Sequence, residues 1–209
     1  SGYLESSAAL VSSGTSSAFN VNWACQFFDY DLDGDLDVFV SVGQVVPITM
    51  VTANDNLLLM NNGDGTFKDI TEQTGLLSTS DGAVNEKTQG ASLVDIDGDG
   101  DIDIIVGNSA SPPRLYYNQA TTQTDNHWIK FDLQAKEGET ALGTLIVINV
   151  GTSTYYNQQK SCAGSFGCDV DAVHFGLGTA DVIDTVTIYW PSGVITSMHD
   201  VDSDQELNI

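Results

Sequence analysis

The sequence predicts an all-β protein made of two similar repeats followed by a smaller β module. Short apolar runs alternate with loops rich in aspartate and glycine, and one strand–loop–strand pattern occurs twice. No long stretch places apolar residues at the 3.6-residue period of a helix. We therefore expect very little helix.

The repeat is clearest at two acidic segments. Residues 29–37 read DYDLDGDLD and residues 95–103 read DIDGDGDID, at an offset of 66 residues. An apolar strand follows each segment, at 38–40 and at 104–106. Self-similarity at a fixed period is typical of repeat folds.

Each unit continues with a longer loop, a strand, a turn and another strand. Residues 57–62 (LLLMNN) correspond to residues 114–119 (RLYYNQ). In the first unit the turn is NGDG at 62–65, where glycine supplies the positive φ that tight turns require.

The domain organisation follows from a change to small polar residues after the second unit. We predict two repeats over 1–119 (about 1–66 and 67–119), a linker at 120–126 and a β module at 127–209. Strands of this module are expected at 127–133, 143–150, 171–176, 183–190, 194–199 and 205–209, with a WPSG turn at 190–193.

Net charge excludes several classes of partner. The chain has 29 acidic side chains against 6 basic ones, a formal net charge of −23. This charge repels nucleic acids and anionic membrane surfaces. The apolar runs are strand-sized, well below the ~20 residues that span a bilayer, so we expect no membrane insertion. Bound cations are the expected compensation for self-repulsion.

Both acidic segments have the pattern of calcium-binding loops. Aspartates at alternate positions of a tight loop converge, glycine at position six permits the bend, and Ca²⁺ takes about 6–8 oxygen ligands. We predict two Ca²⁺ ions. The first is bound by the side chains of Asp29, Asp31, Asp33 and Asp37 and the carbonyl of Asp35; the second by the side chains of Asp95, Asp97, Asp99 and Asp103 and the carbonyl of Asp101.

Other metal sites fit less well. Mg²⁺ keeps more of its waters, and soft metals need His or Cys nearby. The loops are not EF-hands, because Val40 and Val106 occupy the twelfth position, where an EF-hand has glutamate. A solvated acidic turn is the simplest alternative, but two copies in register disfavour it. Since each ion would fix a loop between two strands, a structural role is favoured.

The three cysteines carry little further information. Cys162 and Cys168 bracket a short flexible segment, and they either close it as a disulfide or remain reduced. Cys25 lies among aromatic residues, and we expect a buried free thiol there.

These motifs resemble known families. Residues 28–37 and 61–71 are similar to the FG-GAP/VCBS repeats of β-propeller proteins. The C-terminal part resembles the ASPIC/UnbV module of cartilage-acidic-protein-like secreted proteins, at 126–128 (NHW), 175–178 (FGLG), 190–193 (WPSG) and 204–207 (DQEL). The resemblance implies two propeller-blade-like calcium-binding repeats, a small C-terminal β-sandwich-like module, and an extracellular or cell-surface role in adhesion or scaffolding.

The number of repeats departs from that family. A closed propeller needs about 4–8 blades, and two are recognisable here. Unpaired strand edges invite pairing with another chain. At the offset of 66, residues 1–19 align with the segment that completes a blade. We expect them either to add a strand to a neighbouring copy and build a filament, or to pair within their own chain.

We expect a secreted, calcium-stabilised structural or adhesion protein and not an enzyme. We interpret the chain, which begins at Ser1, as a processed one, although a truncated segment would look the same. No nucleophile elbow, phosphate loop or metalloprotease motif occurs. His127 and His174 stand in structural contexts. Other copies of the chain, glycans, and matrix or cell-surface proteins are the expected partners.

Two alternatives remain open at this point. A calcium-dependent carbohydrate-binding module would use some of the three tryptophans and seven tyrosines as stacking faces, although packing in the β cores explains them more simply. A glycan-acting enzyme is the weaker alternative, because its acid would have to come from carboxyls outside the calcium loops.

Overall fold

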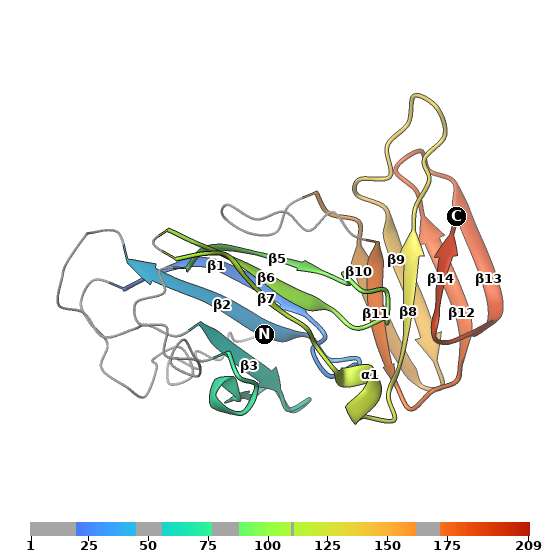
Figure 1. The fold of residues 1–209 in the computed structure, drawn as a ribbon. Coiled ribbons are helices and arrows are strands. Elements are labelled where there is room, and N and C mark those ends of the chain that lie inside the picture. Colours follow the sequence, from blue (N-terminus) through green and yellow to red (C-terminus); the bar gives the residue numbers. More distant parts are fainter. Residues whose placement is uncertain (1–19, 45–55, 77–87, 110, 162–171) are drawn as a thin grey trace.

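The computed structural model describes residues 20–44, 56–76, 88–109, 111–161 and 172–209. Its regular structure is almost entirely β, as predicted, and the described strands form four sheets. The two repeat sheets lie together, and the strands of the C-terminal part run across them (Figure 1). Within the described ranges, neither helix has the length and apolarity needed to cross a bilayer.

The first repeat forms a four-stranded antiparallel sheet in the order β1-β2-β3-β4. Its strands are β1 (Asn20–Phe28), β2 (Asp37–Gln44), β3 (Leu57–Asn61) and β4 (Phe67–Asp69), and the 3₁₀ turn η1 (Thr71–Gln73) follows. Phe28 pairs with Asp37, so residues 29–36 are the loop of the β1–β2 hairpin. Positive φ angles at Gly63 and Gly65 confirm the predicted turn between β3 and β4.

The second repeat forms a sheet of three described strands in the order β5-β6-β7. They are β5 (Thr88–Val94), β6 (Asp103–Asn108) and β7 (Arg114–Tyr116). Val94 pairs with Asp103, which places residues 95–102 in the equivalent hairpin loop. The predicted fourth strand is missing from the described residues, because the chain after β7 enters the one-turn helix α1 (Ala120–Gln123).

The C-terminal part is a two-layer sandwich. Its sheets have the orders β10-β9-β12-β13 and β11-β8-β14, with β14 parallel to β8. The strands are β8 (His127–Asp132), β9 (Leu145–Val150), β10 (Ser153–Gln158), β11 (Val173–Gly178), β12 (Val182–Tyr189), β13 (Ile195–Asp202) and β14 (Gln205–Asn208). A strand lies at each of the six predicted positions, whereas β10 was not predicted.

Two main cores stabilise this arrangement. One lies between the repeat sheets and is formed by buried residues of both, among them Phe39 and Leu58 on one side and Ile104 and Val106 on the other. The other fills the C-terminal sandwich around Phe131. Since the repeats share a core, neither sheet buries its apolar face alone.

Cys25 corrects one prediction. It is a free cysteine and is exposed rather than buried. Side chains alternate along β1, so Ala24 and Gln26 face inward while Cys25 and Phe27 face outward. Of its aromatic neighbours in sequence, Phe28 is buried on the opposite face and Phe27 is itself exposed. Cys162 and Cys168 lie outside the described residues.

Candidate metal centres in the acidic loops

Backbone N–H groups fix both ends of the first acidic loop. Asp29 is 4% exposed, and its Oδ1 and Oδ2 accept hydrogen bonds from the N–H groups of Asp33 (3.1 Å) and Gly34 (2.8 Å). Gly34 has a φ of +93°, which glycine adopts without strain. Asp37 is 1% exposed and accepts bonds from two backbone N–H groups at 2.7 Å.

Three carboxylates of this loop come together. Asp29, Asp31 and Asp37 each offer one oxygen, and these oxygens lie within 4.8 Å of one another. The Oδ1 atom of Asp31 is buried and has no hydrogen-bond partner. A buried acceptor without a donor is unfavourable, and a bound cation would satisfy it.

Burial raises the pKa of four carboxyl groups in the first loop, those of Asp29, Asp31, Asp33 and Asp37. It lifts the pKa of Asp29 well above the ordinary range, and neighbouring carboxylates add to the shift, against the hydrogen bond from Gly34. Burial likewise raises the pKa of Asp37 to about 7. These shifts belong to the loop without a cation, and a divalent cation would favour the ionised forms.

The second acidic loop repeats the arrangement with more exposed side chains. Asp95, Asp97 and Asp99 each bring an oxygen within 4.8 Å of the others, and the last two are exposed. Asp95 accepts hydrogen bonds from the N–H groups of Gly98 (2.7 Å) and Gly100 (3.2 Å). This loop therefore also gathers three carboxylates around a glycine-rich turn.

The side chain of Asp101 is also buried at the second loop, although the loop pattern predicts only the backbone carbonyl of this residue as a ligand. It is 0% exposed, and its Oδ2 accepts hydrogen bonds from the N–H (3.2 Å) and hydroxyl (3.1 Å) of Thr121. Its Oδ1 is buried and has no hydrogen-bond partner. Burial raises the pKa of this carboxyl to about 6. The sequence carried no signal for the contact with Thr121.

The structure gathers only part of each predicted ligand set. All ten predicted aspartates lie at the two loops, but Asp33 and Asp103 stay outside the two clusters of three. Asp33 instead accepts a hydrogen bond from the N–H of Asp35 (2.8 Å). Asp103 accepts bonds from two backbone N–H groups, at 3.0 and 2.8 Å. The ligand roles of all ten aspartates, through side chain or carbonyl, stay predictions.

The donor atoms fit Ca²⁺. Both clusters consist of carboxylate oxygens, which are hard ligands, and neither includes His or Cys. The buried oxygens of Asp31 and Asp101 that lack a donor are the structural reason to expect a cation in each loop.

The C-terminal sandwich packs directly on the first loop. Asn126 Nδ2 donates to the carbonyl of Asp31, and the Gly178 N–H donates to the carbonyl of Leu32, both at 2.8 Å. Leu32 is fully buried with a φ of +63°. A Cβ added to Gly176 would lie 2.6 Å from the backbone of Leu32, so only glycine fits there.

The same sandwich also packs on the second loop. His174 Nε2 lies 2.8 Å from the carbonyl oxygen of Gly100. Trp128 stacks on His174 and lies so close to Gly100 that an added Cβ would overlap its indole ring. Lys130 Nζ donates to Asp95 Oδ2 at 3.1 Å. The two acidic loops are therefore part of an interface within the chain.

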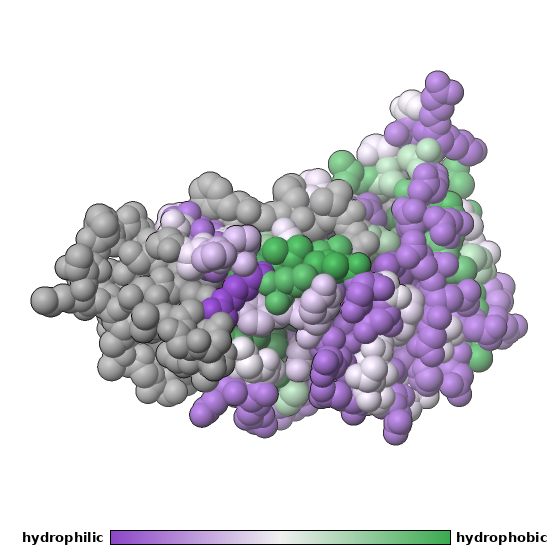
Figure 2. Space-filling view, viewed as in Figure 1, coloured by the Kyte–Doolittle hydropathy of each residue, from purple (hydrophilic) through white to green (hydrophobic). Residues whose placement is uncertain are grey.

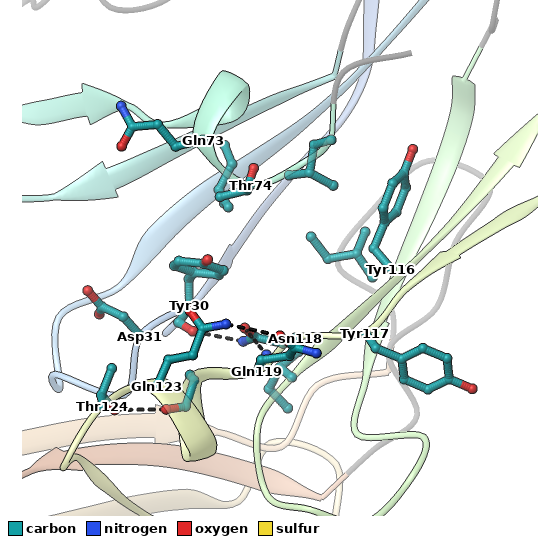
Figure 3. Close-up of a pocket in the computed structure, with 15 residues that line it drawn as sticks. Tyr30, Asp31, Gln73, Thr74, Tyr116, Tyr117, Asn118, Gln119, Gln123 and Thr124 are labelled. Carbon is teal, nitrogen blue, oxygen red and sulfur yellow. Dashed lines mark hydrogen bonds between the residues drawn. The ribbon is translucent and has the colours of Figure 1, made fainter. Parts of the chain in front are cut away.

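A pocket of about 310 Å³ opens beside the first loop, between the repeat sheets (Figure 3). Leucine and isoleucine side chains of the shared core form its apolar part, and Tyr30, Tyr116, Gln73 and Gln123 are among its other lining residues. Asp31, the one acidic residue among the described residues that line it, belongs to the first cluster. The described part of its lining thus offers apolar, hydroxyl and amide surface, and it includes no second carboxyl.

Two of the tryptophans proposed as sugar-stacking faces take part in packing. Trp128 lies against the second loop, and Trp190 packs on the C-terminal core and donates to Thr196 Oγ1 (3.1 Å). For these two side chains, packing is the better explanation than carbohydrate binding.

Comparison with known proteins agrees with the motifs. Residues 29–106 match the model of the FG-GAP-like repeat, and residues 134–209 match the model described as ASPIC and UnbV. Cartilage acidic protein 1 of Xenopus tropicalis is 39% identical over 66 residues, 32% of this chain and 9% of that protein. Cartilage acidic protein 1 of Homo sapiens is 35% identical over 91 residues, 39% of this chain and 13% of that protein. The chain thus spans a small part of these relatives.

Proposed function

Because this chain joins FG-GAP-like repeats to an ASPIC/UnbV domain, we propose that it is an extracellular structural or adhesion protein whose two acidic loops bind Ca²⁺. The position of the loops carries the proposal, since both lie between the repeat sheets and the C-terminal sandwich. An ion in either loop would hold two parts of the fold together.

Charge and compartment support this role. Without a cation, buried carboxylates repel one another in a chain of net charge −23. Extracellular modules bind Ca²⁺ with dissociation constants of about 10⁻⁴–10⁻³ M, which suits ions that stay bound as structural parts. The relatives are named for cartilage, an extracellular tissue.

A non-catalytic role fits the placement of the titratable groups. Every described carboxyl whose pKa is raised lies in one of the two acidic loops. A general acid needs a carboxyl with a raised pKa that is not committed to a metal ion. We therefore place the function in binding and assembly.

Calcium titration of the whole chain tests the proposal. We expect two bound ions by calorimetry, each adding about 2.7 kcal/mol to the free energy of unfolding at 100-fold excess over its Kd. For a chain of this length the unfolding midpoint should rise by roughly 5–10 °C per ion relative to excess EGTA. Magnesium at the same concentration is the control, and equal midpoints in calcium and EGTA would contradict the proposal.

Assembly through a strand edge is the finer part of the proposal. Among the described strands β7 is one of the two edge strands of the second sheet, at the position where the first sheet has β4 beside β3. Leu115 on β7 is exposed, and Figure 2 shows apolar side chains over β5 and β6 on the face in view. The offset of 66 aligns residues 1–3 with β4.

Residues 1–19 of a second copy are the proposed occupant of this edge. They lie outside the described residues, and their contact with β7 would be head-to-tail, which builds a filament when the ring does not close. Deleting residues 1–13 should abolish polymers seen by light scattering and negative-stain microscopy in millimolar Ca²⁺. Replacing residues 1–13 with a Gly/Ser segment of the same length should likewise abolish the polymers. Polymers unchanged by the deletion would exclude this contact.

A further inference from the structure

Lys130 is a buried cation placed at the second acidic loop by the C-terminal sandwich. It lies on β8, the middle strand of the β11-β8-β14 sheet, and is 7% exposed. Its Nζ lies 3.1 Å from Asp95 Oδ2 and 3.0 Å from Glu206 Oε2. A buried ammonium is unfavourable unless carboxylates compensate it.

The structure describes no such cation at the first loop, among the residues it covers. Asp29 occupies the position that corresponds to Asp95, but Gly176 of β11 lies against it, where an added Cβ would overlap its carboxylate. Across the residues that the structure describes, no ion pair joins Asp29 to a basic side chain. The two loops therefore have similar sequences and different electrostatic surroundings.

The carboxylates of the two clusters also differ in burial. In the first cluster Asp29 and Asp37 are buried, whereas in the second cluster Asp97 and Asp99 are exposed. Water screens exposed carboxylates and lowers their repulsion, while buried carboxylates without a counter-charge remain unfavourable. Without metal, no ion pair among the described residues offsets the carboxyl groups of the first loop, whereas Lys130 already places a positive charge at the second.

We propose that Lys130 is a built-in counter-ion of the second loop, so that the two loops bind Ca²⁺ with unequal affinity. This inference rests on the proposed calcium function. The first loop depends on the ion to neutralise its cluster and binds it tightly. The Lys130–Asp95 ion pair holds the second loop in shape without metal. A Ca²⁺ ion that enters this loop is repelled by the ammonium group paired with Asp95, one of its expected ligands.

Calorimetric titration of the full chain with Ca²⁺ alone tests the inference. We expect two resolved steps whose dissociation constants differ at least about 10-fold. Asp31→Asn should weaken the tight step and so assign it to the first loop. Lys130→Met keeps side-chain length without the charge, and it should tighten the weak step by at least about 10-fold.

Two variants keep the test sharp if Lys130→Met folds poorly. Glu206→Gln removes the competing partner of the ammonium, so it should strengthen the Lys130–Asp95 pair and weaken the second step further. Lys136→Met removes the same charge from an exposed position of the same domain and should leave both steps unchanged.

The outcomes separate this inference from the calcium function. Two equal steps in the wild-type chain would overturn the inference and leave calcium binding intact. An unchanged second step in both Lys130→Met and Glu206→Gln would overturn it as well. Absence of any calcium binding would overturn the proposed function and the inference together.

Discussion

Replacing Gly100 with alanine is expected to lower the free energy of unfolding by about 2–5 kcal/mol. The residue has a φ of +97°, where a side chain adds about 1–2 kcal/mol of strain. The new Cβ would also overlap the indole of Trp128, and overpacking of this kind costs about 1–3 kcal/mol. For a chain of this length the midpoint of thermal unfolding should fall by roughly 4–20 °C.

Gly98→Ala is the matched control for this prediction. Gly98 lies in the same loop with a φ of +77°, and nothing stands within 4 Å of an added Cβ. It should therefore show the backbone strain alone. Gly100→Ala should in addition change the fluorescence of Trp128 and increase proteolysis near residues 120–126, because the sandwich no longer packs on the loop. Equal effects of the two substitutions would mean that this contact does not hold the domains together.

Local sequence patterns were enough to predict the acidic hairpins. The alternating aspartates and the strands on either side are contiguous in sequence, and the glycine at position six is needed for a local bend, as the φ angles of Gly34 and Gly100 confirm. The same locality explains why the strands of the C-terminal sandwich were found at their apolar runs.

Features that depend on distant contacts could not be predicted in this way. The strand β10 reads STYYNQ, which is mostly polar, so apolar periodicity does not mark it. Its Tyr155 packs on Gly34, where an added Cβ would lie 2.6 Å from the ring. The NHW and FGLG motifs were recognised, but only the fold shows that Asn126 and Gly178 bind the first loop.

Which aspartates come together in each loop also depends on the tertiary structure. The nine-residue pattern treats both loops alike, yet the first brings Asp37 into its cluster and the second brings in Asp99. Lys130 comes from a strand 35 residues beyond Asp95. A repeat in sequence thus predicts the same local loop twice, but it cannot predict that the C-terminal sandwich places glycine at one loop and lysine at the other.

Asp31→Asn is expected to weaken Ca²⁺ binding at the first loop by at least about 10–100-fold, because one carboxylate of the cluster loses its charge. At the calcium concentration that is a 100-fold excess for the wild-type site, this loss removes about 1.3–2.3 kcal/mol of the ion's contribution, and the unfolding midpoint should fall by roughly 3–9 °C. The backbone carbonyl of Asp31 still accepts its bond from Asn126, so the substitution leaves that interface contact in place.

In excess EGTA the same substitution should no longer destabilise the chain. Without an ion, removal of one charge from three clustered carboxylates relieves repulsion, so the midpoint should stay equal or rise. Glu137→Gln removes the same charge from an exposed position and should leave the unfolding midpoint unchanged in both calcium and EGTA. If Asp31 had a purely structural role, the substitution would destabilise the chain in both conditions. If the loop were a solvated acidic turn, the substitution would destabilise it in neither. Only an ion-binding cluster predicts a loss of stability in calcium that is absent or reversed in EGTA.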